Sequence, residues 1–232
     1  MQLLNFFLSA LKPSDRAVLT QGMSEITLGA AQPLFEIGDA VDAIYFPGSA
    51  CISVVTVLSD GRTVETSTVG RESVVSLLDA AAAQPSRSRV FTQIGGSAMR
   101  IPTAAFRARL VESSDLLALV LLHVRASFLQ AEQGVACNAT HDVRSRLSRW
   151  LLMTQDRVGT DSFPLTQEYM AVMTGVQRST VSTMAASLKR SGVIDYSRGR
   201  VTIASRKALL RHACECYQVV GEQFEGLRND AA

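Results

Sequence analysis

The chain has few of the residues that build redox and metal centres, with four cysteines and three histidines among its 232 residues. The cysteines lack the paired spacing of a disulfide framework and the close clustering that iron–sulfur ligation needs. Cys214 and Cys216 lie one residue apart, with His212 nearby, but a tetrahedral metal site needs further ligands. We therefore expect a structural or incidental role for these residues and no bound metal, while redox sensing by the thiols stays open.

Long apolar runs are also missing. The longest, Leu116–Val124, is far shorter than the roughly 20 residues that a membrane-spanning helix needs, and it contains His123. The N-terminus shows no basic segment followed by a cleavable apolar stretch. We expect a cytoplasmic protein with no membrane partner, in which His123 is a packing or surface residue and not a haem ligand.

Catalytic constellations are absent as well. No nucleophile stands in a recognisable arrangement with a base, and the sequence has no glycine-rich phosphate loop. We therefore expect no enzyme activity. The chain does have an apolar fraction of 47%, which is ample for packed cores, and a length that suits one or two domains.

The most informative segment is 165–203, which reads LTQEYMAVMTGVQRSTVSTMAASLKRSGVIDYSRGRVTI. It predicts two short helices around Gly175, because glycine adopts a positive φ at little cost. Thr166 can cap the first helix. The second helix would bury an apolar face that recurs at helical spacing. That face consists of Val181, Ala185 and Leu188.

Two short strands, Val193–Tyr196 and Arg200–Ile203, would follow around a Ser197-Arg198-Gly199 turn. Two helices and a hairpin in this order predict a winged helix-turn-helix. Charge supports that interpretation. Residues 141–211 hold 12 Lys and Arg against 5 Asp and Glu, a net of +7, whereas residues 1–140 hold 10 against 12, a net of −2. A basic segment on an otherwise neutral chain predicts binding to double-stranded DNA.

The N-terminal half has a different pattern of residues. After two short helices within residues 1–20, runs rich in Val, Ile, Thr and Phe alternate with turn signals from Ile26 to Ile101. Strands at this spacing predict an all-β sandwich or barrel. The clearest hairpin joins Ser53–Leu58 to Thr63–Thr68 through a tight turn at Asp60-Gly61.

A short helix over Thr103–Val111 would precede a long helix that starts near Ser113 or Ser114. Apolar residues recur along the long helix at steps of four and three, which predicts a coiled-coil seam in a homodimer. The predicted interface residues are Leu117, Leu121, Val124, Phe128, Ala131 and Val135. Asn138 continues the series and would set the register. The alternative is a helix packed only on its own domain. Further helices are predicted over His141–Met153 and Lys207–Leu227.

This order of elements resembles the Crp/Fnr superfamily of bacterial transcription regulators. The resemblance covers nearly the whole chain and rests on LTQEYMAVMTGVQRSTVS, SGVIDYSRGRVTI, RSRLSRWLL and the DGR hairpin followed by TVGRESVV. The CECY segment at Cys214–Tyr217 resembles a large branch whose signals are mostly undefined.

The resemblance implies an α+β fold in three parts. Residues 1–112 would form a β-roll, the cyclic-nucleotide-binding-like jelly roll, with N-terminal helices. Residues 113–140 would form the long dimerisation helix, and residues 141–232 a winged helix-turn-helix DNA-binding domain with a C-terminal helix.

For DNA, the resemblance implies a dimer with two recognition helices in successive major grooves of a near-palindromic site. Gln177 suits adenine, and Arg178 suits either guanine or phosphate. Ser179 and Thr183 stand where better-known members have Glu and Arg, so the family's common half-site is not carried over. The candidate base-reading residues are Gln177, Arg178, Ser179, Ser182 and Thr183. The candidate phosphate contacts are Thr166, Gln167, Lys189, Arg198 and Arg200.

For ligands, members that bind cyclic nucleotides use a Gly-Glu pair for the ribose and an Arg-Ser pair for the cyclic phosphate. The candidate ligand residues here are Gly70, Glu72, Arg87 and Ser88. Arg71 stands where the Glu belongs, and a shift of one residue turns a side chain to the other face of a strand. A cyclic nucleotide, another small ligand and no ligand all stay open. In the last case Glu72 and Arg87 would form a structural ion pair.

The sequence thus predicts a homodimeric, sequence-specific transcriptional regulator with no certain cofactor. It would be either ligand-independent or gated by an effector other than cAMP, and RNA polymerase is a further candidate partner. The alternative is a small-ligand-binding sensor module whose DNA-binding domain is weak or vestigial.

Overall fold

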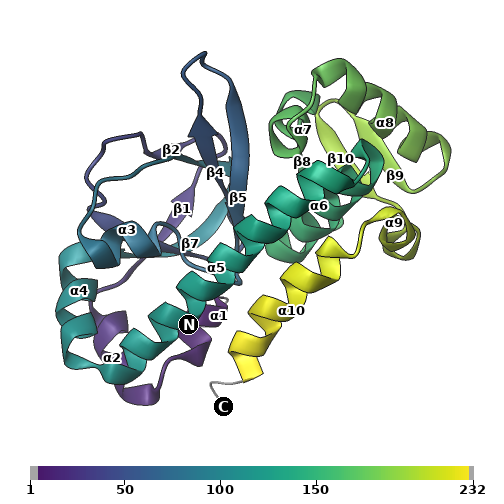
Figure 1. The fold of residues 1–232 in the computed structure, drawn as a ribbon. Coiled ribbons are helices and arrows are strands. Elements are labelled where there is room, and N and C mark those ends of the chain that lie inside the picture. Colours follow the sequence, from purple (N-terminus) through teal and green to yellow (C-terminus); the bar gives the residue numbers. More distant parts are fainter. Residues whose placement is uncertain (1–4, 230–232) are drawn as a thin grey trace.

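A β-sheet domain and a mainly helical domain are joined by one long helix, α5 (Ser114–Thr140), in the computed structural model, which describes residues 5–229 (Figure 1). The α+β fold predicted from the sequence, a β-roll followed by a long helix and a winged helix-turn-helix, is confirmed. Residues 1–4, the start of the segment predicted to hold two short N-terminal helices, lie outside the described residues.

The β-roll consists of two antiparallel sheets with a shared apolar core. One sheet has the order β1 (Ser24–Leu28), β7 (Gly96–Pro102), β3 (Ala43–Pro47). The other has the order β2 (Pro33–Phe35), β6 (Arg89–Ile94), β4 (Cys51–Val57), β5 (Thr63–Val69). Short helices flank the sheets: α1 (Phe6–Ala10), α2 (Pro13–Gln21), α3 (Leu77–Ala82) and α4 (Thr103–Glu112). Phe7, Phe46 and Phe106 are fully buried between them.

The hairpin β4–β5 forms where the sequence predicts it, but its turn is not the tight two-residue turn expected at Asp60-Gly61. The loop spans Leu58–Arg62, closed by a hydrogen bond of 2.8 Å from Leu58 N to Arg62 O. Gly61 has a φ of +82°. The Asp60 carboxylate accepts hydrogen bonds from the backbone and side chain of Arg62, which stabilises the longer loop.

Helix α5 begins where predicted, because the Ser113 side chain accepts a hydrogen bond from Leu116 N and caps it. By length and composition alone, α5 could cross a bilayer. However, one of its faces is packed inside the protein. On that face His123 and Gln130 are buried, and they hydrogen-bond Glu72 O at 3.2 Å and Ser67 Oγ at 2.9 Å. This face attaches α5 to the β-roll.

The C-terminal domain contains a helix-turn-helix and a three-stranded sheet. Its helices are α6 (Val143–Val158), α7 (Gln167–Thr174), α8 (Arg178–Arg190), α9 (Arg206–His212) and α10 (Cys216–Asn229). Its sheet has the order β8 (Ser162–Pro164), β10 (Arg200–Ile203), β9 (Ile194–Ser197).

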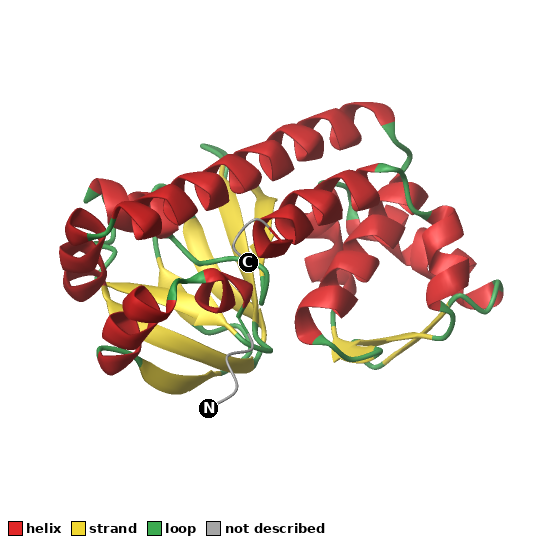
Figure 2. Ribbon diagram, turned by 90° about the horizontal axis from the view of Figure 1, so that it is seen from below, coloured by secondary structure: helices red, strands yellow, loops and turns green. Residues whose placement is uncertain are grey.

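Two predicted helices differ from the structure. The helix expected over His141–Met153 begins at Val143, after the Asp142 cap, and continues to Gly159, where φ is +72°. The single helix expected over Lys207–Leu227 is interrupted at Ala213, whose backbone is extended. The interruption lets α10 turn back and lie alongside α5 (Figures 1 and 2).

Candidate nucleic-acid interface and interdomain pocket

Helices α7 and α8 are positioned by the signals that the sequence carries. The Thr166 side chain caps α7 by accepting a hydrogen bond from Tyr169 N. Gly175 ends α7 in the left-handed conformation with a φ of +66°. Val181, Ala185 and Leu188 are buried and hold α8 on the domain core. The opposite face of α8 is therefore free to meet a partner.

The predicted base-reading residues cluster at the N-terminal end of α8. Gln177, Arg178, Ser179 and Thr183 are exposed. Ser182 is half-buried, and its hydroxyl donates a hydrogen bond of 2.6 Å to Gln167 Oε1 on α7. This contact fixes the two helices to each other. The Ser182 hydroxyl proton and Gln167 Oε1 are therefore already used in a hydrogen bond within the protein.

The wing is the β9–β10 hairpin. Arg198 and Gly199 form its two-residue turn, and both have a positive φ, of 49° and 72°, as a type I′ turn requires. Leu165 N donates to Gly199 O at 2.8 Å, which places the turn beside the start of α7. The side chains of Arg198 and Arg200 are exposed.

Lys189 has a different environment from the other candidate phosphate contacts. Its Nζ lies 2.7 Å from Asp195 Oδ1 and donates to Tyr196 O at 3.0 Å. The hydrogen bond and charge of Lys189 lower the pKa of Asp195. Lys189 thus ties the end of α8 to the wing.

The predicted dimer seam forms an exposed stripe on α5. The side chains of Leu121, Phe128 and Val135 are 60%, 63% and 71% exposed. Leu117 and Ala131 are exposed as well, and Val124 is half-buried. Asn138 is exposed, and its Oδ1 accepts a hydrogen bond from Arg146 at 3.1 Å. Apart from Val124, which packs against the β-roll core, the stripe faces away from the packed side of α5.

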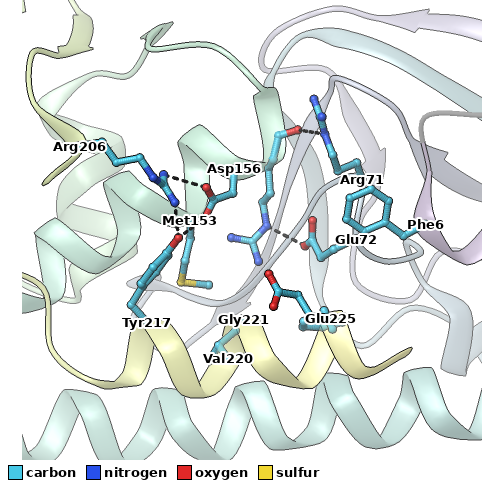
Figure 3. A pocket seen from close by; sticks show the side chains of 12 residues that line it. Phe6, Arg71, Glu72, Met153, Asp156, Arg206, Tyr217, Val220, Gly221 and Glu225 are labelled. Atoms are coloured by element: carbon cyan, nitrogen blue, oxygen red, sulfur yellow. Dashed lines mark hydrogen bonds and ion pairs between the residues drawn. The ribbon is translucent and has the colours of Figure 1, made fainter. Parts of the chain in front are cut away.

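The candidate ligand residues are not brought together around one cavity. Glu72 lines a pocket of about 190 Å³ between the β-roll, α6 and α10, and neither Arg87 nor Ser88 lines it (Figure 3). The expected ion pair between Glu72 and Arg87 is wrong. Glu72 Oε1 instead lies 2.8 Å from Arg157 Nε, on α6, while Arg87 is exposed and its charge acts on Asp79.

Three consecutive residues of the β-roll engage Arg157. Glu72 pairs with its guanidinium, and Arg71 Nε donates to its carbonyl oxygen at 3.0 Å (Figure 3). A Cβ on Gly70 would lie 2.4 Å from Arg157 Cγ, so only glycine lets the Arg157 side chain pass. We call Gly70, Arg71, Glu72 and Arg157 the interdomain clamp. Three of its residues, Gly70, Arg71 and Glu72, belong to the segment where the resemblance implies ligand-binding residues.

Comparison with known proteins agrees with this architecture. Residues 145–212 match the family of the Crp-like helix-turn-helix domain. The C-terminal domain is therefore similar to the helix-turn-helix domain of Crp-like proteins.

The similarity to known proteins extends beyond the matched domain. The CRP-like cAMP-activated global transcriptional regulator of Mycobacterium tuberculosis is 23% identical over 210 residues, covering 88% of this chain and 94% of that protein. The global nitrogen regulator of Synechocystis is 23% identical over 194 residues, covering 79% and 85%. FixK2 from Bradyrhizobium japonicum superposes with a TM-score of 0.71 at 14% identity, over 83% and 98% of the two chains. The last similarity shows the shared fold.

The interdomain clamp lies beside a buried polar group that was not predicted from the sequence. Glu65 on β5 is 4% exposed, and its Oε1 accepts a hydrogen bond from Ser53. Burial raises the pKa of Glu65 to about 7, against the opposing effects of Ser53 and Arg157. Arg157 was also missed. It lies 85 residues from Glu72, and no local pattern marks it as the partner.

Proposed function

We propose that the chain is a homodimeric, sequence-specific DNA-binding regulator that dimerises through the exposed stripe of α5. The observation that carries this proposal is the contrast between the two faces of one helix. Leu116, Leu119 and Val120 are buried against the chain's own core, whereas large apolar side chains on the other face reach 71% exposure at Val135. An apolar stripe with a heptad repeat is stabilised by a second copy of the same helix.

In the proposed dimer, each α8 enters a major groove of a near-palindromic site. Its exposed N-terminal residues Gln177 and Arg178 would reach base edges, since these side chains pair bidentately with adenine and guanine. Thr166, Arg198 and Arg200 would contact phosphates from the start of α7 and from the wing. The net charge of +7 on residues 141–211 supports this assignment.

The proposed regulator does not use a cyclic nucleotide held by Glu72. The name of the mycobacterial relative states that cAMP activates that protein. Here the Glu72 carboxylate is already paired with Arg157, and the Arg157 side chain fills the space over Gly70. This arrangement favours regulation that is ligand-independent or driven by another effector. We place the protein in the cytoplasm, with RNA polymerase as a partner on promoter DNA.

The dimer proposal is tested by placing charge in the stripe. Phe128→Asp combined with Leu121→Asp, two substitutions at exposed positions of the stripe, should convert a dimer into a monomer in multi-angle light scattering and abolish high-affinity DNA binding. The matched control is Val111→Asp, because Val111 is 90% exposed on α4 and lies off the stripe. A double variant that stays dimeric would place the interface elsewhere.

A further inference from the structure

Four side chains that are far apart in the sequence meet where α5 ends. Cys137 and His141 lie one turn apart at the end of α5, and Cys214 and Cys216 lie between α9 and the start of α10. Their ligand atoms all lie within 4.8 Å of one another. The three cysteines are buried and His141 is half-buried. The interruption at Ala213, which splits the predicted tail helix, brings the last two cysteines to the first.

The spacing of these atoms fits a tetrahedral metal ion. Cys137 Sγ and Cys214 Sγ are 3.5 Å apart, and Cys216 Sγ is 3.6 Å from His141 Nδ1. Zinc–sulfur bonds of about 2.3 Å and zinc–nitrogen bonds of about 2.0 Å at tetrahedral angles separate two sulfurs by about 3.8 Å and a sulfur from a nitrogen by about 3.5 Å. A disulfide needs about 2.05 Å between two sulfurs and would leave the third thiol and the imidazole unused.

Neighbouring groups orient two of the four side chains. His141 Nδ1 faces Cys216, while His141 Nε2 lies 3.2 Å from the Glu215 carboxylate. A carboxylate on the far nitrogen fixes the tautomer and direction of a metal-binding histidine. Gln133 Nε2 donates to Cys216 Sγ at 3.0 Å, as outer hydrogen bonds do to metal-bound thiolates.

A buried cation lies near the cluster. Arg149 is 2% exposed, and its contacts are the Met153 sulfur at 3.2 Å and the Trp150 ring. The positive charge of Arg149 acts on the Cys137 side chain. Three thiolates around one divalent ion leave a single negative charge, which would compensate the buried guanidinium of Arg149.

We propose that Cys137, His141, Cys214 and Cys216 bind a thiophilic divalent metal ion, with Zn²⁺ as the expected occupant. Three thiols lose their protons to solvent when they bind, and the neutral imidazole supplies the fourth ligand. The four positions are all taken by protein, so the site is structural. It would hold α10 against the end of α5, beside the His141–Asp142 joint that leads into α6.

The site corrects an expectation from the sequence. His212 was expected to be the histidine nearest to Cys214 and Cys216, with too few ligands for a metal. His212 is not part of the cluster, and the missing ligands come from the end of α5 instead. A separation of 77 residues between Cys137 and Cys214 hides this set from any local motif.

The first test uses the unaltered chain and needs no DNA. The protein is purified under reducing conditions, and native mass spectrometry should show one zinc ion per chain that a chelator removes. Cobalt added to the metal-free protein should give thiolate-to-cobalt charge transfer and the strong visible bands of a tetrahedral site. A chain that takes up neither zinc nor cobalt in stoichiometric amount would overturn the proposal.

Variants locate the site. Cys137→Ser and Cys216→Ser should each lower the affinity for zinc by at least tenfold. Cys51→Ser should leave it unchanged, because Cys51 is a fully buried cysteine of β4 outside the cluster. His141→Cys should keep one bound metal with an added sulfur ligand, which guards against variants that fail to fold. Equal metal loss in Cys51→Ser and Cys137→Ser, or a Cys137–Cys214 disulfide in the reduced, metal-treated protein, would contradict the proposal.

Discussion

Glu72 of the β-roll and Arg157 of α6 form an ion pair of 2.8 Å across the boundary between the two domains. The Arg157 side chain is 4% exposed and that of Glu72 is 12% exposed. Arg71, which stands where the resemblance implies a ligand-binding Glu, donates to the last turn of α6, where a positive charge is favourable. A segment that resembles a ligand cassette thus serves here as a contact between domains.

Glu72→Gln should destabilise the protein strongly, because it leaves the buried guanidinium of Arg157 without its counter-charge. We expect a loss on the order of 3 kcal/mol in the free energy of unfolding, measured with urea. Glu36→Gln is the matched control, since the Glu36–Arg89 pair is about half exposed and should contribute about 0–1 kcal/mol. Equal losses in both variants would show that the clamp adds nothing beyond a surface ion pair.

Glu65 should make stability depend on pH. Burial raises its pKa from 4.5 to about 7 in the folded chain. Between these values the folded state holds a proton that the unfolded state has lost, so this group's contribution is full below about pH 4.5 and is lost as pH rises to about 7. Glu65→Gln should remove that slope. The measurement is urea unfolding of both proteins across this range, and an unchanged slope in the variant would assign it to other groups.

Arg178→Ala should weaken specific DNA binding. If Arg178 reads a base, preference at one position of each half-site should relax by about 1–3 kcal/mol. Arg190→Ala is the control on the same helix, because Arg190 lies at its opposite end and is also exposed. Binding titrations against single-base variants of the site would measure both. Uniform weakening on every sequence would instead assign Arg178 to phosphate.

Local signals in the sequence were sufficient for the helix-turn-helix. Thr166, Gly175 and the buried face of α8 act through their own turn or helix, so their spacing predicts their positions. The prediction of a tight β4–β5 turn was wrong because an Asp-Gly pair suits more than one type of turn. The contacts of Asp60 with Arg62 select the longer loop.

Contacts between residues far apart in the chain could not be predicted from the sequence. Glu72 meets Arg157, and Cys137 meets Cys214, only after the β-roll, α5 and α10 have packed together. No periodicity encodes such contacts. The tail helix was predicted as continuous because Lys207–Leu227 contains no proline. Its two glycines, Gly221 and Gly226, both lie within α10. The actual break comes at Ala213, where tertiary contacts of the cysteines override local helical preference.

The most direct test of the central claim is selection of fragments from random double-stranded DNA by the purified protein without added ligand, at two salt concentrations. A dimer that carries two α8 helices should recover a near-palindromic motif, with half-sites spaced by about 10 bp or a multiple of it. The motif should persist at the higher salt while total binding falls. Recovery of weak, salt-sensitive binding without any sequence motif would contradict a ligand-independent, sequence-specific regulator.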